Sequence, residues 1–130
     1  MIALDTCALV YWLRGDEALS EPARGAIEGA LDGGSEVLIS TISVLEIAQF
    51  VENGRLALSM DTRRWLATLA SLEGVRMVPV DTAIAVRATT MSPQLPQPQR
   101  LIAATARTLG VPLVTPDARM RELTHLDTIW

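Results

Sequence analysis

Short apolar runs alternate along the chain with longer segments of helical periodicity. Uninterrupted apolar runs are typical of strands covered on both faces, as in a parallel sheet. Pro79 places the third strand at a sheet edge or ends it, because proline has no backbone N–H to donate. Four strands are expected at Met1–Leu4, Val37–Ser40, Val75–Val80 and Val111–Thr115, and a short fifth at Thr128–Trp130.

The helices are predicted from apolar residues three and four positions apart and from capping residues. Ser20 with Pro22 starts one helix, and Asp81 caps another. The three prolines between Met91 and Gln99 indicate an extended loop. The other expected helices are Thr6–Leu13, one capped by Thr41 or Ser43, one capped by Ser59, Leu101–Leu109, and a short one beginning at Pro116–Asp117. The pattern predicts an α/β fold with a central, mostly parallel sheet of four or five strands flanked by helices.

Composition limits the class of protein. With 130 residues and 49% hydrophobic content, the chain is expected to form a single globular domain over residues 1–130. No apolar run reaches the ~20 residues of a membrane helix, and the N-terminus lacks a basic signal segment. A cytoplasmic protein without membrane contact is therefore expected, with its single cysteine, Cys7, as a small buried residue. The net charge of −4 counts against broad electrostatic binding of nucleic acid.

Three acidic residues are expected at the carboxyl ends of the strands. Asp5 follows the first strand, Asp117 follows the fourth, and Glu46 interrupts an apolar helix after the second. Ligands of open α/β sheets bind outside these strand ends. Oxygen ligands without histidine or cysteine suit Mg²⁺ or Mn²⁺, so a metal site is expected. The alternatives are helix capping by Asp5 and Asp117, and an ion pair between Glu46 and an arginine.

Four segments in this order resemble the PIN-domain family, and in particular the VapC-type ribonuclease toxins of toxin–antitoxin pairs. They are Ile2–Thr6, Ile39–Glu46, Arg100–Ala106 and Leu113–Asp117. The resemblance implies a PIN-like fold and a Mg²⁺-dependent endoribonuclease, with Mn²⁺ as a substitute. It also implies RNA as the substrate, a cognate antitoxin as a partner, and a homodimer.

The resemblance also implies roles for single residues. Asp5, Glu46 and Asp117 match the family's catalytic, metal-binding acids. A further acid usually precedes the Arg100–Ala106 segment, where this chain has Gln99. Glutamine can bind Mg²⁺ through its carbonyl oxygen but adds no charge, so a weakened nuclease is predicted.

Neighbouring residues are expected to support these acids. The hydroxyl groups of Thr6, Ser43 and Thr115 are expected to orient the carboxylates by hydrogen bonds. Arg100, beside Gln99, is expected to contact a substrate phosphate or to form a surface ion pair. Apolar residues expected to line a groove for an antitoxin helix are Tyr11, Trp12, Phe50, Trp65 and Leu69. The alternative is that some of them belong to the core or to a self-dimer surface.

Two other functions remain open at this point. Because of Gln99, the chain could be a pseudonuclease that binds antitoxin or RNA without efficient cleavage. Alternatively, it could be a PIN ribonuclease in RNA processing, outside any toxin pair.

Overall fold

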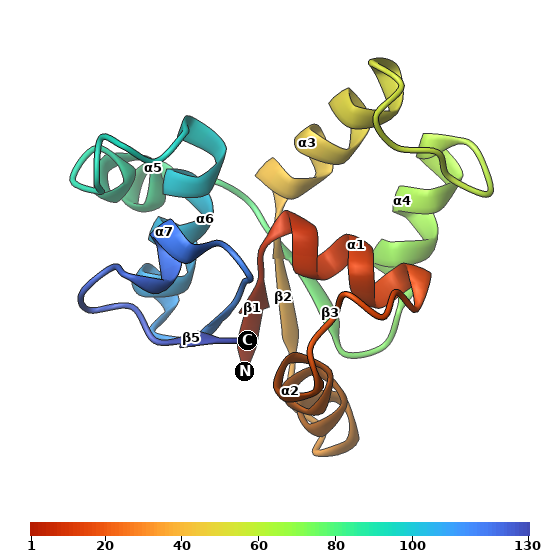
Figure 1. Ribbon diagram of the computed structural model, residues 1–130, viewed down its shortest axis with the longest axis horizontal. Helices are drawn as coiled ribbons and strands as arrows, with labels where there is room; N and C mark the ends of the chain where they lie inside the picture. The colour runs from red at the N-terminus through yellow and green to blue at the C-terminus, as the bar shows by residue number, and fades with distance from the viewer.

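The computed structural model describes all 130 residues as one five-stranded sheet with seven helices around it (Figure 1). The strands are β1 (Ile2–Leu4), β2 (Val37–Ser40), β3 (Val75–Val78), β4 (Leu113–Val114) and β5 (Thr128–Ile129). The helices are α1 (Thr6–Arg14), α2 (Glu21–Asp32), α3 (Thr41–Glu52), α4 (Thr62–Ser71), α5 (Thr82–Ala88), α6 (Gln97–Leu109) and α7 (Ala118–Arg121). No helix is both long and apolar enough to cross a membrane.

All neighbouring strands of the sheet are parallel, in the order β3-β2-β1-β4-β5. Leu4 at the end of β1 is in register with Ile39 of β2 and with Val114 of β4. The carboxyl ends of these three strands therefore meet at one edge of the sheet. The predicted α/β fold with a parallel sheet is confirmed, and β3 is an edge strand that ends immediately before Pro79.

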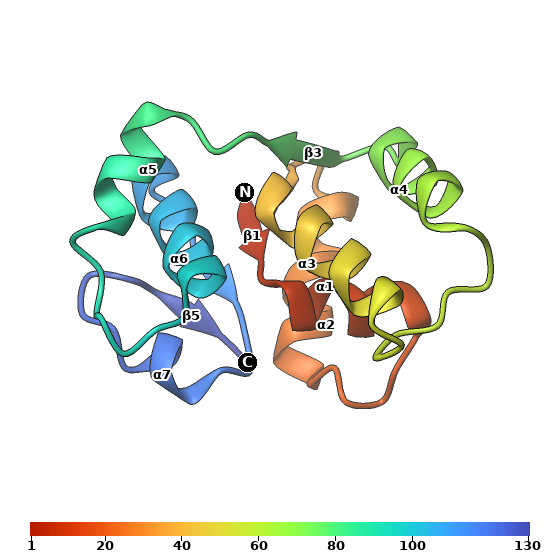
Figure 2. The ribbon, with the colours of Figure 1, turned by 90° about the horizontal axis from the view of Figure 1, so that it is seen from above.

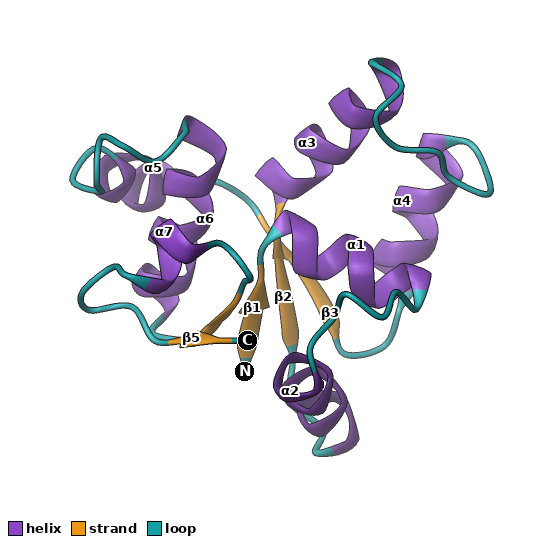
Figure 3. Ribbon diagram, viewed as in Figure 1, coloured by secondary structure: helices purple, strands orange, loops and turns teal.

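Helices cover both faces of the sheet, as Figure 3 shows by the purple helices around the orange strands. Successive side chains of a strand point to opposite faces, and the buried residues follow this alternation. Ala3 belongs to the core under α5 and α6, whereas Ile2 and Leu4 belong to the core under α1 and α2. Figure 2 shows these two groups of helices on opposite sides of β1.

Four local predictions were wrong. Helix α6 begins at Gln97, so the expected loop ends earlier, because Pro98 lies in the first helical turn, where its missing N–H costs nothing. Ser40 caps α3 in place of Thr41 or Ser43, and Asp61 caps α4 in place of Ser59. Cys7 is exposed, because its position on α1 faces away from the core.

Candidate active site

Residues following β1, β2 and β4 line one pocket of about 180 Å³ at the carboxyl edge of the sheet. Its walls are Asp5, Thr6, Cys7, Glu46, Phe50, Gln99, Pro116 and Asp117. The fold thus brings the three predicted acids and Gln99 to the same depression, although they are far apart in the sequence. Each carboxylate is held by a different set of partners.

Asp5 is the N-cap of α1 and is almost fully buried, with 4% of its surface exposed. Its Oδ1 accepts a hydrogen bond from the Ala8 backbone N–H at 2.8 Å, and its Oδ2 accepts one from the Thr115 hydroxyl at 2.6 Å. Burial raises the pKa of Asp5 to about 6, against the lowering effect of these two hydrogen bonds. The negative charges of Asp117 and Glu46 raise this pKa further.

Glu46 projects from α3 into the same pocket and is also buried. Its Oε1 accepts a hydrogen bond of 2.5 Å from the Thr6 hydroxyl, and Thr6 Oγ1 lies 2.9 Å from Ser43 Oγ. No arginine pairs with Glu46, since the salt bridges of the structure are Arg76–Glu36 and Arg119–Asp117. The alternative of an ion pair at Glu46 is therefore wrong.

Asp117 is the N-cap of α7 and is turned toward that helix. Its Oδ1 accepts from the backbone N–H groups of Arg119 and Met120, and the Arg119 guanidinium donates to both of its oxygens. Burial raises the pKa of Asp117, but these hydrogen bonds outweigh it and leave the pKa below the ordinary value. The Thr115 hydroxyl, which holds Asp5, also accepts from the Asp117 backbone N–H at 3.0 Å.

The three carboxylates line one pocket but are not arranged around a common position for a metal ion. No group of three Asp, Glu, His or Cys side chains is arranged closely enough to hold an ion as it stands. The Asp117 carboxylate caps α7 and pairs with Arg119. The donors themselves fit Mg²⁺ or Mn²⁺: all are hard oxygens, and the charge on buried Asp5 lacks a nearby cation.

The family model described as "PIN domain" matches residues 2–126. The chain belongs to the PIN domain family. It is 34% identical over 133 residues to Ribonuclease VapC22 of Mycobacterium tuberculosis, a match that covers 99% of this chain and 98% of the relative. The resemblance predicted from the four sequence segments is confirmed.

Solved structures show the same fold at lower sequence identity. VapBC2 from Rickettsia felis, solved bound to a DNA fragment from its promoter, matches with a TM-score of 0.73 and 16% identity, over 98% of this chain and 97% of that one. FitAcB from Neisseria gonorrhoeae matches with a TM-score of 0.65 and 21% identity, over 98% and 96%. The architecture of this PIN domain is therefore shared with chains crystallised in VapBC and Fit complexes.

Two further predicted residues of the PIN domain have clear positions. Gln99 lies in the first turn of α6 and lines the acid pocket. Arg100 points elsewhere: its Nε donates to the Leu95 carbonyl at 2.7 Å and its Nη2 to the Pro93 carbonyl at 2.6 Å. This geometry ties Arg100 to the preceding loop and argues against both the substrate contact and the surface ion pair predicted for it.

Arg119 was absent from the predicted site, although it contacts one of the acids. The sequence held a signal for it, because an aspartate that caps a helix places its carboxylate beside the first turn. An arginine two positions later can reach that carboxylate. No local sequence pattern indicates that Cys7 is exposed or that Phe50 lines the pocket.

Proposed function

We propose that this PIN domain is a divalent-metal-dependent endoribonuclease that acts as the toxin of a toxin–antitoxin pair. The observation that carries the proposal is the pocket lined by Asp5, Glu46 and Asp117 at the carboxyl edge of the parallel sheet. The relatedness to Ribonuclease VapC22 over nearly the whole chain supports RNA as the substrate.

Asp5, Glu46 and Asp117 are the residues that would hold Mg²⁺, or Mn²⁺ in its place, with the Gln99 carbonyl as a neutral fourth ligand. A bound ion supplies an activated water and offsets the negative charge that develops on the phosphate. Other residues of the chain hold the carboxylates in position by hydrogen bonds. Thr115 and the Ala8 N–H fix Asp5, and the Thr6 hydroxyl fixes Glu46.

Asp117 is the one acid of this set that is paired with a cation of the chain. Its partner Arg119 is about half exposed, so the carboxylate can leave the guanidinium at small cost. Three acids supply a charge of −3, which suits one Mg²⁺ ion but offsets poorly the +4 of two. We therefore expect one weakly held ion and slow cleavage.

A cognate antitoxin and a homodimer complete the proposal. Structural neighbours include the VapBC and FitAcB complexes, which supports an antitoxin partner. Of the residues predicted for its groove, Tyr11 and Phe50 line an open apolar pocket, and Trp12 and Trp65 are partly buried against the core. Leu69 is fully buried in that core and is excluded from the groove.

The test is cleavage of single-stranded RNA by the full chain with Mg²⁺ and with EDTA, beside the Asp5→Asn variant. Cleavage that requires Mg²⁺ and is lost in Asp5→Asn supports the proposal. Cleavage that survives in EDTA or in Asp5→Asn refutes it. The presence of Gln99 in the pocket favours one second candidate, a pseudonuclease, which is the conclusion if the folded parent binds RNA or antitoxin and leaves RNA intact.

A further inference from the structure

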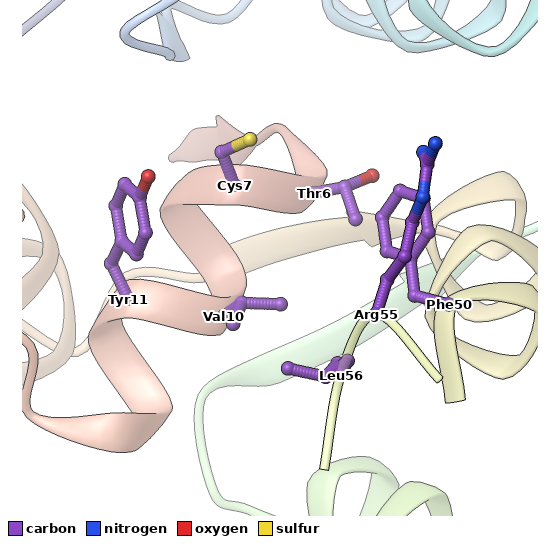
Figure 4. Close-up of a pocket in the computed structure, with 7 residues that line it drawn as sticks. All are labelled: Thr6, Cys7, Val10, Tyr11, Phe50, Arg55 and Leu56. Atoms are coloured by element: carbon purple, nitrogen blue, oxygen red, sulfur yellow. The ribbon is translucent and has the colours of Figure 1, made fainter. Parts of the chain in front are cut away.

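A second pocket, of about 230 Å³, adjoins the acid pocket (Figure 4). Its walls are Thr6, Cys7, Val10, Tyr11, Phe50, Arg55 and Leu56. Thr6, Cys7 and Phe50 also line the acid pocket, so the two are adjacent parts of one depression. We call this second, mostly apolar part the side pocket.

The end of α3 builds one wall of the side pocket. Asn53 caps the helix, and Gly54, with φ +80°, takes the left-handed conformation that turns the chain back. The backbone N–H groups of Arg55 and Leu56 then donate to the Phe50 carbonyl at 2.8 and 3.1 Å. This turn brings a guanidinium group and an apolar side chain next to the Phe50 ring.

The side pocket combines an available aromatic ring with an unpaired cation. Figure 4 shows Tyr11 of α1 on one side of it, and Phe50 with Arg55 on the other. Tyr11 already packs on Trp130, with ring centroids 6.3 Å apart, whereas Phe50 has no aromatic neighbour. Arg55 is exposed, forms no salt bridge, and is the only charged residue of this wall.

We propose that the side pocket binds a nucleobase of the RNA, one that adjoins the phosphate held at the acid pocket, with the base on Phe50 and a neighbouring phosphate on Arg55. The proposal rests on the proposed function and names a subsite for its substrate. Single-stranded RNA is commonly bound by stacking of splayed bases on aromatic side chains, while arginine binds phosphate oxygens through its fork of donors.

Charge favours a nucleotide in the side pocket. The volume of about 230 Å³ lies below the range of roughly 300 to 1,000 Å³ for drug-sized ligands and accommodates one planar ring. Arg55 is the only charged residue that lines the side pocket, so it is the group there that can bind a phosphate oxygen. Because the side pocket is continuous with the acid pocket, a base in the side pocket can be joined directly to a phosphate in the acid pocket.

The experiment measures RNA binding apart from cleavage. Full-length protein carrying Asp5→Asn, in EDTA, is titrated against a fluorescein-labelled single-stranded RNA octamer of mixed sequence, and anisotropy is read at several salt concentrations. Phe50→Leu keeps an apolar side chain but removes the ring. Arg55→Gln removes the charge, and Arg63→Gln, an exposed arginine of α4 outside both pockets, is its matched control.

Phe50→Leu should weaken binding roughly 5-fold or more and leave the salt dependence unchanged, since a stacked base contributes about 1 to 3 kcal/mol. Arg55→Gln should weaken binding and lower the slope of log K against log salt by about one, the signature of one lost phosphate contact. Arg63→Gln should change neither quantity.

The proposal is overturned if the octamer fails to bind, or if Phe50→Leu and Arg55→Gln both bind it as the parent does. It is also overturned if the two variants lose affinity only for a co-expressed antitoxin, which would assign the side pocket to the protein partner. Loss of the subsite and loss of the proposed function remain distinguishable, because Mg²⁺-dependent cleavage by the unmodified chain is scored separately. Arg55 is exposed, so its variant tests the proposal even if Phe50→Leu folds poorly.

Discussion

The guanidinium group of Arg119 contacts both oxygens of the Asp117 carboxylate, with Nη2 3.1 Å from Oδ2 and Nε 3.4 Å from Oδ1. The Arg119 side chain is 53% exposed, so the pair is partly screened by solvent and weak. A divalent cation at the proposed site would therefore compete with Arg119 for the same two oxygens. Of the three acids of the pocket, Asp117 is the one already neutralised by a cation of the chain itself.

Replacing this arginine should strengthen metal binding. Arg119→Gln frees the Asp117 carboxylate, and we expect Mn²⁺ to bind up to about 5-fold more tightly, the equivalent of an ion pair of at most ~1 kcal/mol. The measurement is isothermal titration calorimetry with Mn²⁺. Arg121→Gln, an exposed and unpaired arginine of the same helix, removes the same charge. An equal gain in both variants would show that net charge, and not the ion pair, sets the affinity.

The raised pKa of Asp5 makes the metal-free protein less stable as the pH rises. Below pH 3.8 the folded and unfolded chains both hold this proton. Between pH 3.8 and about 6 only the unfolded chain releases it, so the free energy of unfolding falls. The loss amounts to about 3 kcal/mol at 1.36 kcal/mol for each pH unit and persists above pH 6.

Asp5→Asn should remove this pH-dependent loss. Asparagine still caps α1, so the variant should be more stable than the metal-free parent at pH 7.5 and gain nothing at pH 4. Urea unfolding in EDTA at both values is the measurement. Asp81→Asn, at the exposed cap of α5, is the control and should shift neither value by more than about 0.5 kcal/mol. A variant less stable than the parent at pH 7.5 would mean that Asp5 serves mainly to hold the fold.

A carboxylate at position 99 should complete the metal site. Gln99 lines the acid pocket, so Gln99→Asp adds a charged oxygen ligand there. We expect Mg²⁺ to act at roughly 10-fold lower concentration and RNA cleavage to accelerate. The assay is a Mg²⁺ titration of cleavage. Gln97→Asp makes the same change two residues earlier, at an exposed position outside the pocket, and should behave as the parent does.

The Thr115 hydroxyl should contribute more to the free energy of unfolding than an ordinary buried hydroxyl does. It donates to the Asp5 carboxylate and accepts from the Asp117 N–H, so Thr115→Val leaves two polar groups without partners. We expect a loss of about 1.5 to 3 kcal/mol in the free energy of unfolding at pH 7.5. Thr105→Val is the matched control, because the buried Thr105 hydroxyl bonds only to the Leu101 carbonyl of its own helix. Equal losses in the two variants would contradict the bridging role of Thr115.

The parallel sheet was predictable because its strands are buried on both faces and therefore stand out as short apolar runs. The bounds of β2 agree with the prediction, and Asp81 and Ser20 cap helices as expected. The start of α6 was missed because Pro98 was interpreted as part of a loop, although proline is equally suited to a first helical turn.

The site was less predictable than the fold. Strand-end positions placed Asp5 and Asp117 in one pocket, since parallel strands in register end together. The orientation of Asp117 toward Arg119, the exposure of Cys7 and the loop contacts of Arg100 depend on side-chain geometry in three dimensions. No periodicity or spacing in the sequence carries that information.

The hydrogen bond between Thr115 and Asp5 joins residues 110 positions apart, and β4 pairs directly with β1. During synthesis on the ribosome, Asp5 and Glu46 leave the exit tunnel long before Thr115 and Asp117 are translated. The half-made chain therefore carries two acids of the pocket without the third and without the hydroxyl that holds Asp5. The full set of three acids can assemble only after the chain has left the tunnel beyond residue 117, so a nascent chain lacks the complete pocket.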